Sequence, residues 1–148
     1  MSNERNIEVF SVALDNALEA AQENANEVKR TVALDLLSRI VDRTPVDTGR
    51  ARANWQVSLS SPRLGETSYA NTDKIPQGRQ ETAVAGRAKA KGAAILRNVQ
   101  EGQDIWITNN LPYINRLETG TWSDQAPQGM VAISIAEVEQ AIKLRRDL

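Results

Sequence analysis

Apolar residues recur at steps of three and four through the first third of the chain, which is the period of an α-helix. This spacing predicts a helix from about residue 6 to about residue 43, with an apolar stripe made of Phe10, Leu14, Ala17, Leu18, Ala21, Val28, Val32, Leu36 and Ile40. A straight helix of that length would measure about 57 Å, whereas a domain of this size has a radius of gyration of about 15 Å. We therefore expect the helix either to break within the polar stretch 22–27 or to pack against a neighbouring subunit.

The helical pattern ends near Pro45, because proline disfavours helical geometry in the residue before it. Asp47 and Gly49 are turn residues, and we expect Gly49 to need a positive φ. From Arg50 to Ser60 apolar and polar residues alternate, which predicts a half-buried strand. Its buried side would hold Ala51, Ala53, Trp55, Val57 and Leu59, and its solvated or partner-facing side would hold Arg50, Arg52, Asn54, Gln56, Ser58 and Ser60.

The middle of the chain predicts a long loop, a helix and a second strand. Residues 61–77 have no hydrophobic period and contain two prolines, so we expect a loop there. Residues 78–100 are rich in good helix formers, although Gly86 and Gly92 weaken a helix. Residues 103–109 alternate as a strand, with Ile105 and Ile107 on one face and Trp106 on the other.

The last third predicts a turn at 109–112, a short helical or extended piece at 113–118 and a loop at 123–129. From Met130 onward apolar residues step by three and four, which favours an amphipathic helix with basic residues at its C-terminal end. Residues 131–135 also alternate, so a strand is the alternative there. Together the elements predict one α+β domain over residues 1–148. It has a long N-terminal helix (1–44) and a body (45–148) that holds a small antiparallel sheet, a middle helix and a C-terminal amphipathic helix.

Composition narrows the chemistry further. The chain of 148 residues contains six aromatic residues and is 41% apolar, a thin core that another copy of the chain could complete. It contains neither cysteine nor histidine, which excludes thiolate nucleophiles, Cys-based zinc sites and imidazole bases. We expect no metal or cofactor. Residues 1–10 include acidic side chains and do not resemble a signal peptide, and no apolar run is long enough to span a membrane.

Charge is concentrated in the middle third. Residues 43–97 carry ten bases and four acids, whereas both flanking thirds are acidic. Arg79, Arg87, Lys89, Lys91 and Arg97 could contact phosphates, and Arg87 and Lys91 share a helix face at a spacing of four. We take Arg87, Lys91 and Arg97 as candidate DNA-facing residues. A solvated helix face is the plainer interpretation, because exposed charge is common.

Two further features have both a functional and a structural interpretation. Residues 47–49, Asp-Thr-Gly, match the catalytic triplet of aspartic proteases. That chemistry needs two carboxylates sharing a proton, and Arg50 and Arg52 would oppose such sharing. We favour a structural turn of Pro45, Asp47 and Gly49, in which Asp47 accepts from nearby backbone N–H groups. Trp122 lies in a polar loop and is either a core residue or an interface anchor.

Two segments taken together resemble the small head–tail connection proteins of tailed double-stranded DNA phages, described as neck, tail-completion or minor tail proteins. One is residues 43–55, RTPVDTGRARANW, and the other is residues 110–122, NLPYINRLETGTW, followed by Ala126-Pro127. The loop after Ser60 is less typical of the family. The resemblance implies an α+β subunit of a virion ring at the head–tail junction, a hexamer without catalysis or cofactor, assembled in the host cytoplasm.

The partners implied by the resemblance are further copies of the chain, other neck, connector and tail proteins, and DNA that passes through the ring. The interface candidates are Phe10, Leu14, Arg50, Arg52 and Trp122. The alternatives are a non-enzymatic DNA-binding protein that uses the basic middle segment, and an aspartate-dependent hydrolase. A mass measurement in solution distinguishes the ring protein from the DNA-binding protein and from the hydrolase.

Overall fold

The structure is a computed structural model that describes residues 25–71, 73–75, 82–120 and 123–146. The predicted helix before residue 25, with Phe10 and Leu14, lies outside the described residues, and so does Trp122. The described chain is mixed helix and sheet, in the order α2 (Ala25–Arg43), α3 (Arg50–Ala53), β1 (Gln56–Leu59), α4 (Thr82–Leu96), β2 (Ile105–Thr108), α5 (Ile114–Glu118) and α6 (Val131–Arg146). This confirms the predicted α+β class.

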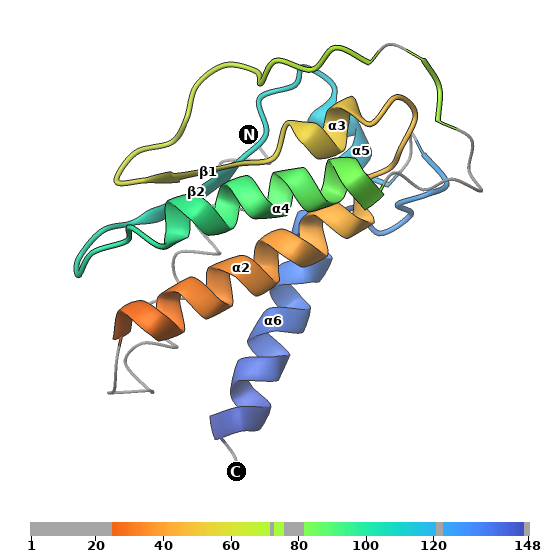
Figure 1. Cartoon of the computed structure of the whole chain (residues 1–148). Helices are drawn as coiled ribbons and strands as arrows, with labels where there is room; N and C mark the ends of the chain where they lie inside the picture. Colours follow the sequence, from red (N-terminus) through yellow and green to blue (C-terminus); the bar gives the residue numbers. More distant parts are fainter. Residues whose placement is uncertain (1–24, 72, 76–81, 121–122, 147–148) are drawn as a thin grey trace.

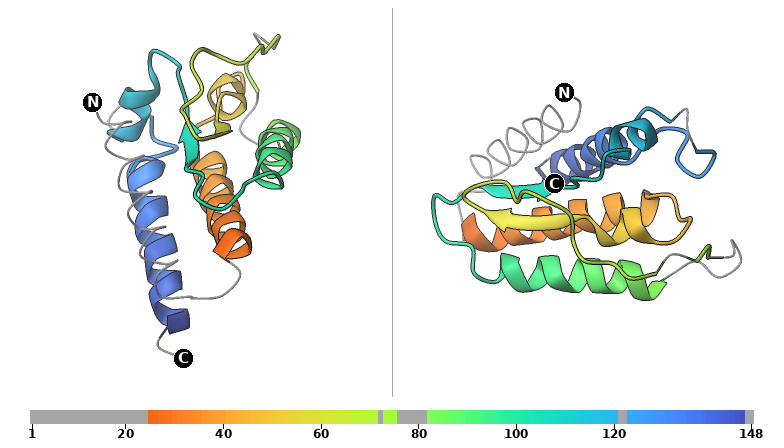
Figure 2. Two further views of the ribbon diagram at one scale, coloured as in Figure 1. Left: turned by 90° about the vertical axis from the view of Figure 1, so that its left-hand side faces the viewer. Right: turned by 90° about the horizontal axis from the view of Figure 1, so that it is seen from above.

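Helix α2 is the centre of the fold. It lies between α4 on one side and α6 on the other (Figure 1; Figure 2, left). Its buried residues recur at the helical period, as the sequence predicted, and include Ala33, Leu36, Leu37, Ile40 and Val41. Burial of each such aliphatic side chain contributes about 1.5–3 kcal/mol, so α2 supplies the main apolar stripe of the core.

The two strands form an antiparallel ribbon in which Val57 pairs with Ile107 and Ser58 pairs with Trp106. Val57, Ile105 and Ile107 are buried in the core, while Trp106 is half-buried on the opposite face. The predicted alternation in the second strand is therefore confirmed. The strand is shorter than predicted, covering 105–108 rather than 103–109.

Helix α4 packs closely on both α2 and β1. A side chain at Gly92 would collide with Leu37 and would lie 3.0 Å from Val57. The glycine that weakened the helix prediction is therefore what allows this close approach. The predicted helix of 78–100 ends earlier, at Leu96, because Asn98 and Val99 close turns onto Ile95 and Leu96 instead.

One prediction from alternation was wrong. Residues Arg50–Ala53 form the helix α3 rather than the start of a strand, and the strand covers only residues 56–59. Ala53 N–H donates to Gly49 O at 3.0 Å and Asn54 N–H donates to Arg50 O at 3.1 Å. Alanine and arginine are good helix formers, so these local hydrogen bonds prevail over the period-two pattern.

In the last third, residues 114–118 form a helix and residues 131–146 form a helix, which settles both alternatives that the sequence left open. Residues 60–71 and 73–75 run over the top of the molecule without helix or strand, as the loop prediction expected (Figure 1). No helix of the described residues is long and apolar enough to cross a membrane.

Candidate functional site

Side-chain amides on either side of the segment 110–122 bind backbone groups of the segment 43–55. We call the contact between residues 43–55 and residues 109–130 the junction. Gln125 Oε1 accepts from Val46 N–H at 2.8 Å, and Gln125 Nε2 donates to Val46 O at 3.0 Å, across 79 positions of sequence. Asn109 Nδ2 donates to Ala51 O at 2.9 Å. The side-chain amides of Gln125 and Asn109 thus satisfy backbone groups within residues 43–55.

Thr44 and Arg52 finish the C-terminal end of α2. Thr44 is fully buried; its Oγ1 donates to Ile40 O at 2.7 Å and accepts from Trp55 Nε1 at 2.8 Å. Arg52 Nε donates to Thr44 O at 2.9 Å, and Arg52 Nη2 donates to Asp42 O at 3.1 Å. A helix leaves its last carbonyl groups without intrahelical donors, and the Arg52 guanidinium supplies them.

Arg52 was an interface candidate, and the structure contradicts that assignment. Only 5% of it is exposed, because its side chain binds backbone carbonyl groups at the C-terminal end of α2. Burial lowers its pKa from the ordinary arginine value, and the charge of Asp42 opposes that shift. Arg50, the other arginine candidate in the described part, is exposed and forms an ion pair with Glu66.

The turn at Gly49 has the backbone conformation that the sequence predicted, with a φ of +91°. A Cβ at this position would lie 2.5 Å from Tyr69 Oη, the atom that donates to Thr48 O. The prediction for Asp47 was wrong: its exposed side chain is not the cap, and Thr48 Oγ1 accepts from Arg50 N–H at 3.3 Å. Asp47 acts through its carbonyl oxygen, which accepts from Ile75 N–H at 2.6 Å.

Glu118 holds the start of α6. Its carboxylate accepts from the backbone N–H groups of Met130, Val131 and Ala132 at 3.0, 2.9 and 3.1 Å. A carboxylate at this position satisfies N–H groups that the helix cannot pair and complements the helix dipole. Gly120 follows with a φ of +77°, at a place where a side chain would collide with Pro127 O. The sequence pattern Glu-x-Gly therefore has a structural role in this chain.

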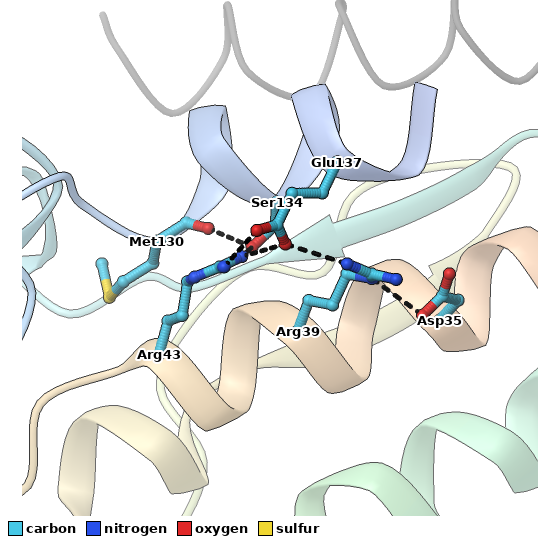
Figure 3. Close-up of polar contacts among 6 residues, drawn as sticks. All are labelled: Asp35, Arg39, Arg43, Met130, Ser134 and Glu137. Carbon is cyan, nitrogen blue, oxygen red and sulfur yellow. Dashed lines mark hydrogen bonds and ion pairs between the residues drawn. The ribbon is translucent and has the colours of Figure 1, made fainter. Parts of the chain in front are cut away.

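A second polar cluster joins α2 to α6 (Figure 3). Arg43 binds Glu137 through two nitrogen–oxygen pairs at 2.6 and 2.5 Å, and Arg39 Nη1 lies 2.9 Å from the same carboxylate. Arg39 also pairs with Asp35 at 2.9 Å. Hydrogen bonds from Arg43 and then Arg39 lower the pKa of Glu137 to about 2, against the effect of desolvation. Sequence reasoning missed this cluster, although the spacing of four between Asp35, Arg39 and Arg43 is a usable signal.

Arg50 and Tyr113 of the junction and Glu66 of the neighbouring loop form a mixed polar face. Tyr113 is half-buried; burial raises its pKa, the charge of Arg50 lowers it, and the charges of Glu66 and Asp47 raise it. These groups lie at the end of the molecule that carries α3 and α5 (Figure 1). Among the described residues, no three Asp or Glu side chains lie close enough together to hold a metal ion.

The candidate DNA-facing residues lie elsewhere. Arg87 and Lys91 are exposed on α4, and Arg97 is exposed just after it. Lys89, part of the same basic set, instead binds Asp42 of α2 at 2.7 Å. The candidate DNA-facing residues thus lie on and just after α4, whereas the turn residues lie between α2 and α3. Arg79 lies outside the described residues.

Comparisons with family models, with curated proteins and with solved structures found no match to this chain.

Proposed function

We propose that this chain is a structural subunit of a phage virion, which forms a ring at the neck and completes or joins the tail at the head–tail junction. The proposal rests on the resemblance of residues 43–55 and 110–122 to the head–tail connection proteins. The observation that carries it is the contact between residues 43–55 and 109–130 within the chain, where Gln125 binds Val46 and Asn109 binds Ala51. Residues on either side of the segment 110–122 thus hold the segment 43–55, as expected if the distinctive residues define a fold rather than a catalytic site.

The distribution of polar chemistry supports a role in assembly. Thr44, Arg52 and Asn54 are buried and engaged with backbone groups, and Glu118 caps a helix. The Asp47 carboxylate, the hydrolase candidate, is exposed, with the Arg50 charge close to it in sequence.

A ring needs two unlike surfaces on each subunit that fit each other after a rotation. In the described part, one such surface is the polar face of the junction, around Arg50, Glu66 and Tyr113. The other is the stripe of the N-terminal segment that the sequence places at Phe10 and Leu14, which lie outside the described residues. We propose that the N-terminal segment contacts a neighbouring subunit or another neck protein.

Sedimentation velocity of the purified chain tests the proposal. A closed ring has a mass that is a fixed multiple of the 16.3 kDa chain, six for the expected hexamer. Phe10→Ala with Leu14→Ala should weaken assembly by roughly thirtyfold per residue, because truncation of a buried anchor costs about 2 kcal/mol. Leu144→Ala is the matched control, since Leu144 is an exposed leucine at the far end of α6.

Circular dichroism is recorded beside each sedimentation run. We expect the double variant to keep its helical signal while it loses mass, and the control variant to keep both. A parent chain that stays monomeric at every concentration and is absent from assembled particles would contradict the proposal. Loss of helix equal to the loss of assembly would contradict the proposed role of Phe10 and Leu14.

A further inference from the structure

Helix α4 has one face that no other described element covers. Its inner side, with Val84, Ala85 and Ala88, is buried in the core. In Figure 2 (left) α4 lies at the outside of the molecule, with α2 between it and α6. The exposed residues of the helix and of the turn after it fall within an arc of about 140° at 100° per residue: Ala83, Gly86, Arg87, Ala90, Lys91, Ala94, Arg97 and Asn98. We call this arc the outer face of α4.

The outer face carries only positive charge. The helix from Thr82 to Leu96 contains no acidic residue. Within the part of the chain that the structure describes, Arg87, Lys91 and Arg97 make no ion pair, whereas Lys89 on the adjacent side is neutralised by Asp42 at 2.7 Å. The nearest exposed acids of the described chain in sequence, Glu101 and Asp104, lie beyond the end of the helix.

The side chains between the cations are small. Ala83, Ala90 and Ala94 run along the middle of the outer face, so the helix backbone can approach a flat or rounded surface closely. Arg87 and Lys91 stand about 6 Å apart along the helix axis, and Arg97 stands about 15 Å from Arg87 if the helical rise is continued. The face offers three cations along its length, without aromatic side chains for stacking and with Asn98 as its one side-chain amide for reading base edges.

We infer that the outer face of α4 binds the phosphate backbone of double-stranded DNA without reading its sequence. Unpaired cations displace the counterions of the duplex when they contact phosphates, and this release provides the binding free energy. The whole chain has a net charge of −1, so the attraction is local to this face. The inference goes beyond the proposed function, since it assigns binding to one helix face and holds whether or not the chain forms a ring.

Fluorescence anisotropy with a labelled duplex of about 30 base pairs tests the inference, with the full-length chain in 50 to 200 mM KCl. The outer-face variant is R87Q/K91Q/R97Q. The matched control is R63Q/K143Q/R145Q, which removes the same charge from exposed positions outside α4. If three phosphate contacts are lost, the affinity of the parent should fall about 40-fold more than that of the outer-face variant over this fourfold rise in salt.

We expect the control variant to keep the salt dependence of the parent, and two duplexes of different base composition to bind within about twofold. Equal affinity and equal salt dependence of the two triple variants would overturn the inference, and so would a parent that does not bind at 50 mM KCl. If the outer-face variant loses its oligomeric mass but keeps its DNA affinity, the face is a subunit interface and the inference is wrong. DNA binding by a monomeric parent supports the inference and contradicts the ring. Failure of the inference is therefore distinguishable from failure of the proposed function.

Discussion

Arginine is used in opposite ways in the junction and on the outer face of α4. Arg52 is 5% exposed and donates to two backbone carbonyl groups at the end of α2. Arg87 is exposed and makes no ion pair among the described residues. Both arginines occur in segments rich in alanine and basic residues, so composition alone does not separate them. Their surroundings show that the first one stabilises the fold and that the second one is available to a partner.

The same contrast holds for carboxylates. Glu118 caps α6 and Glu137 binds two arginines of α2, whereas the Asp47 side chain is exposed at a turn. Substitution of a polar residue whose hydrogen bonds are made within the chain should lower the free energy of unfolding. Substitution of a polar residue that faces solvent should change that free energy little and should affect only assembly or binding.

Gly49→Val should have the largest effect on stability. A β-branched residue is strained at a φ of +91°, and its Cβ would displace Tyr69, so we expect a loss of about 3 kcal/mol in the free energy of unfolding. Urea unfolding followed by circular dichroism measures it. The control is Gly102→Val, where φ is +81° but an added Cβ meets no atom within 4 Å; strain alone should cost about 1–2 kcal/mol there. Equal losses at the two positions would show that contact with Tyr69 does not matter.

Glu118→Ala should rank second. It removes the acceptor of three backbone N–H groups at the start of α6, and the expected loss is about 2 kcal/mol. Glu118→Gln keeps one acceptor oxygen without the charge and should lose about half as much. The urea midpoint should fall while the slope of the transition stays the same. Glu139→Ala is the control, because it changes an exposed glutamate within α6. A similar loss of stability in that control would contradict the capping role of Glu118.

The sequence predicted the fold where the period of apolar residues is long. The apolar steps of α2 and α6 and the alternation of Ile105, Trp106 and Ile107 correspond to the structure. The prediction was wrong at Arg50–Ala53, where the apolar positions of the period of two are both alanines, which favour a helix. The helix is favoured over the strand there by two features. The positive φ of Gly49 turns the chain, and the carbonyl groups of Asp42 and Thr44 bind the Arg52 side chain.

The site was predicted less completely than the fold. The turn at Gly49 follows from residue type, because a left-handed backbone favours glycine. The binding of Gln125 to Val46 spans 79 positions, and no local pattern marks such a pair. The exposure of Arg87 and Lys91 was predicted by their shared helix face, whereas the engagement of Lys89 with Asp42 depends on how α4 packs against α2.

Glu137→Gln should have a moderate effect that depends on pH. The pKa of Glu137 is about 2 in the folded chain, against an ordinary value of 4.5. The unfolded chain therefore binds more protons between these values, so the contribution of Glu137 is fully present above about pH 4.5 and is lost as pH falls towards 2. Because 36% of its side chain is exposed, solvent screens the pairs and we expect about 1 kcal/mol at neutral pH.

Urea unfolding at pH 7, 4.5 and 3 measures this dependence. The parent and the Glu137→Gln variant should converge in stability as pH falls, and the difference between them should shrink at high salt, which screens partly exposed ion pairs. Glu139→Gln is the control on the same helix. A stability difference that stays constant from pH 7 to pH 3 would mean that the Arg43 and Arg39 pairs do not stabilise the contact of α2 with α6.

Asp47→Asn should have the smallest effect, within about 0.5 kcal/mol, because exposed substitutions away from buried networks are usually close to neutral. The carbonyl oxygen of Asp47, which accepts from Ile75 N–H, is kept in the variant. The same variant separates the structural turn from an aspartate-dependent hydrolase, since removal of one carboxylate abolishes a dyad. A fluorogenic peptide assay of parent and variant completes the test. Peptidase turnover in the parent that disappears in Asp47→Asn would contradict the structural turn, and a loss of several kcal/mol would show that the exposed carboxylate is engaged after all.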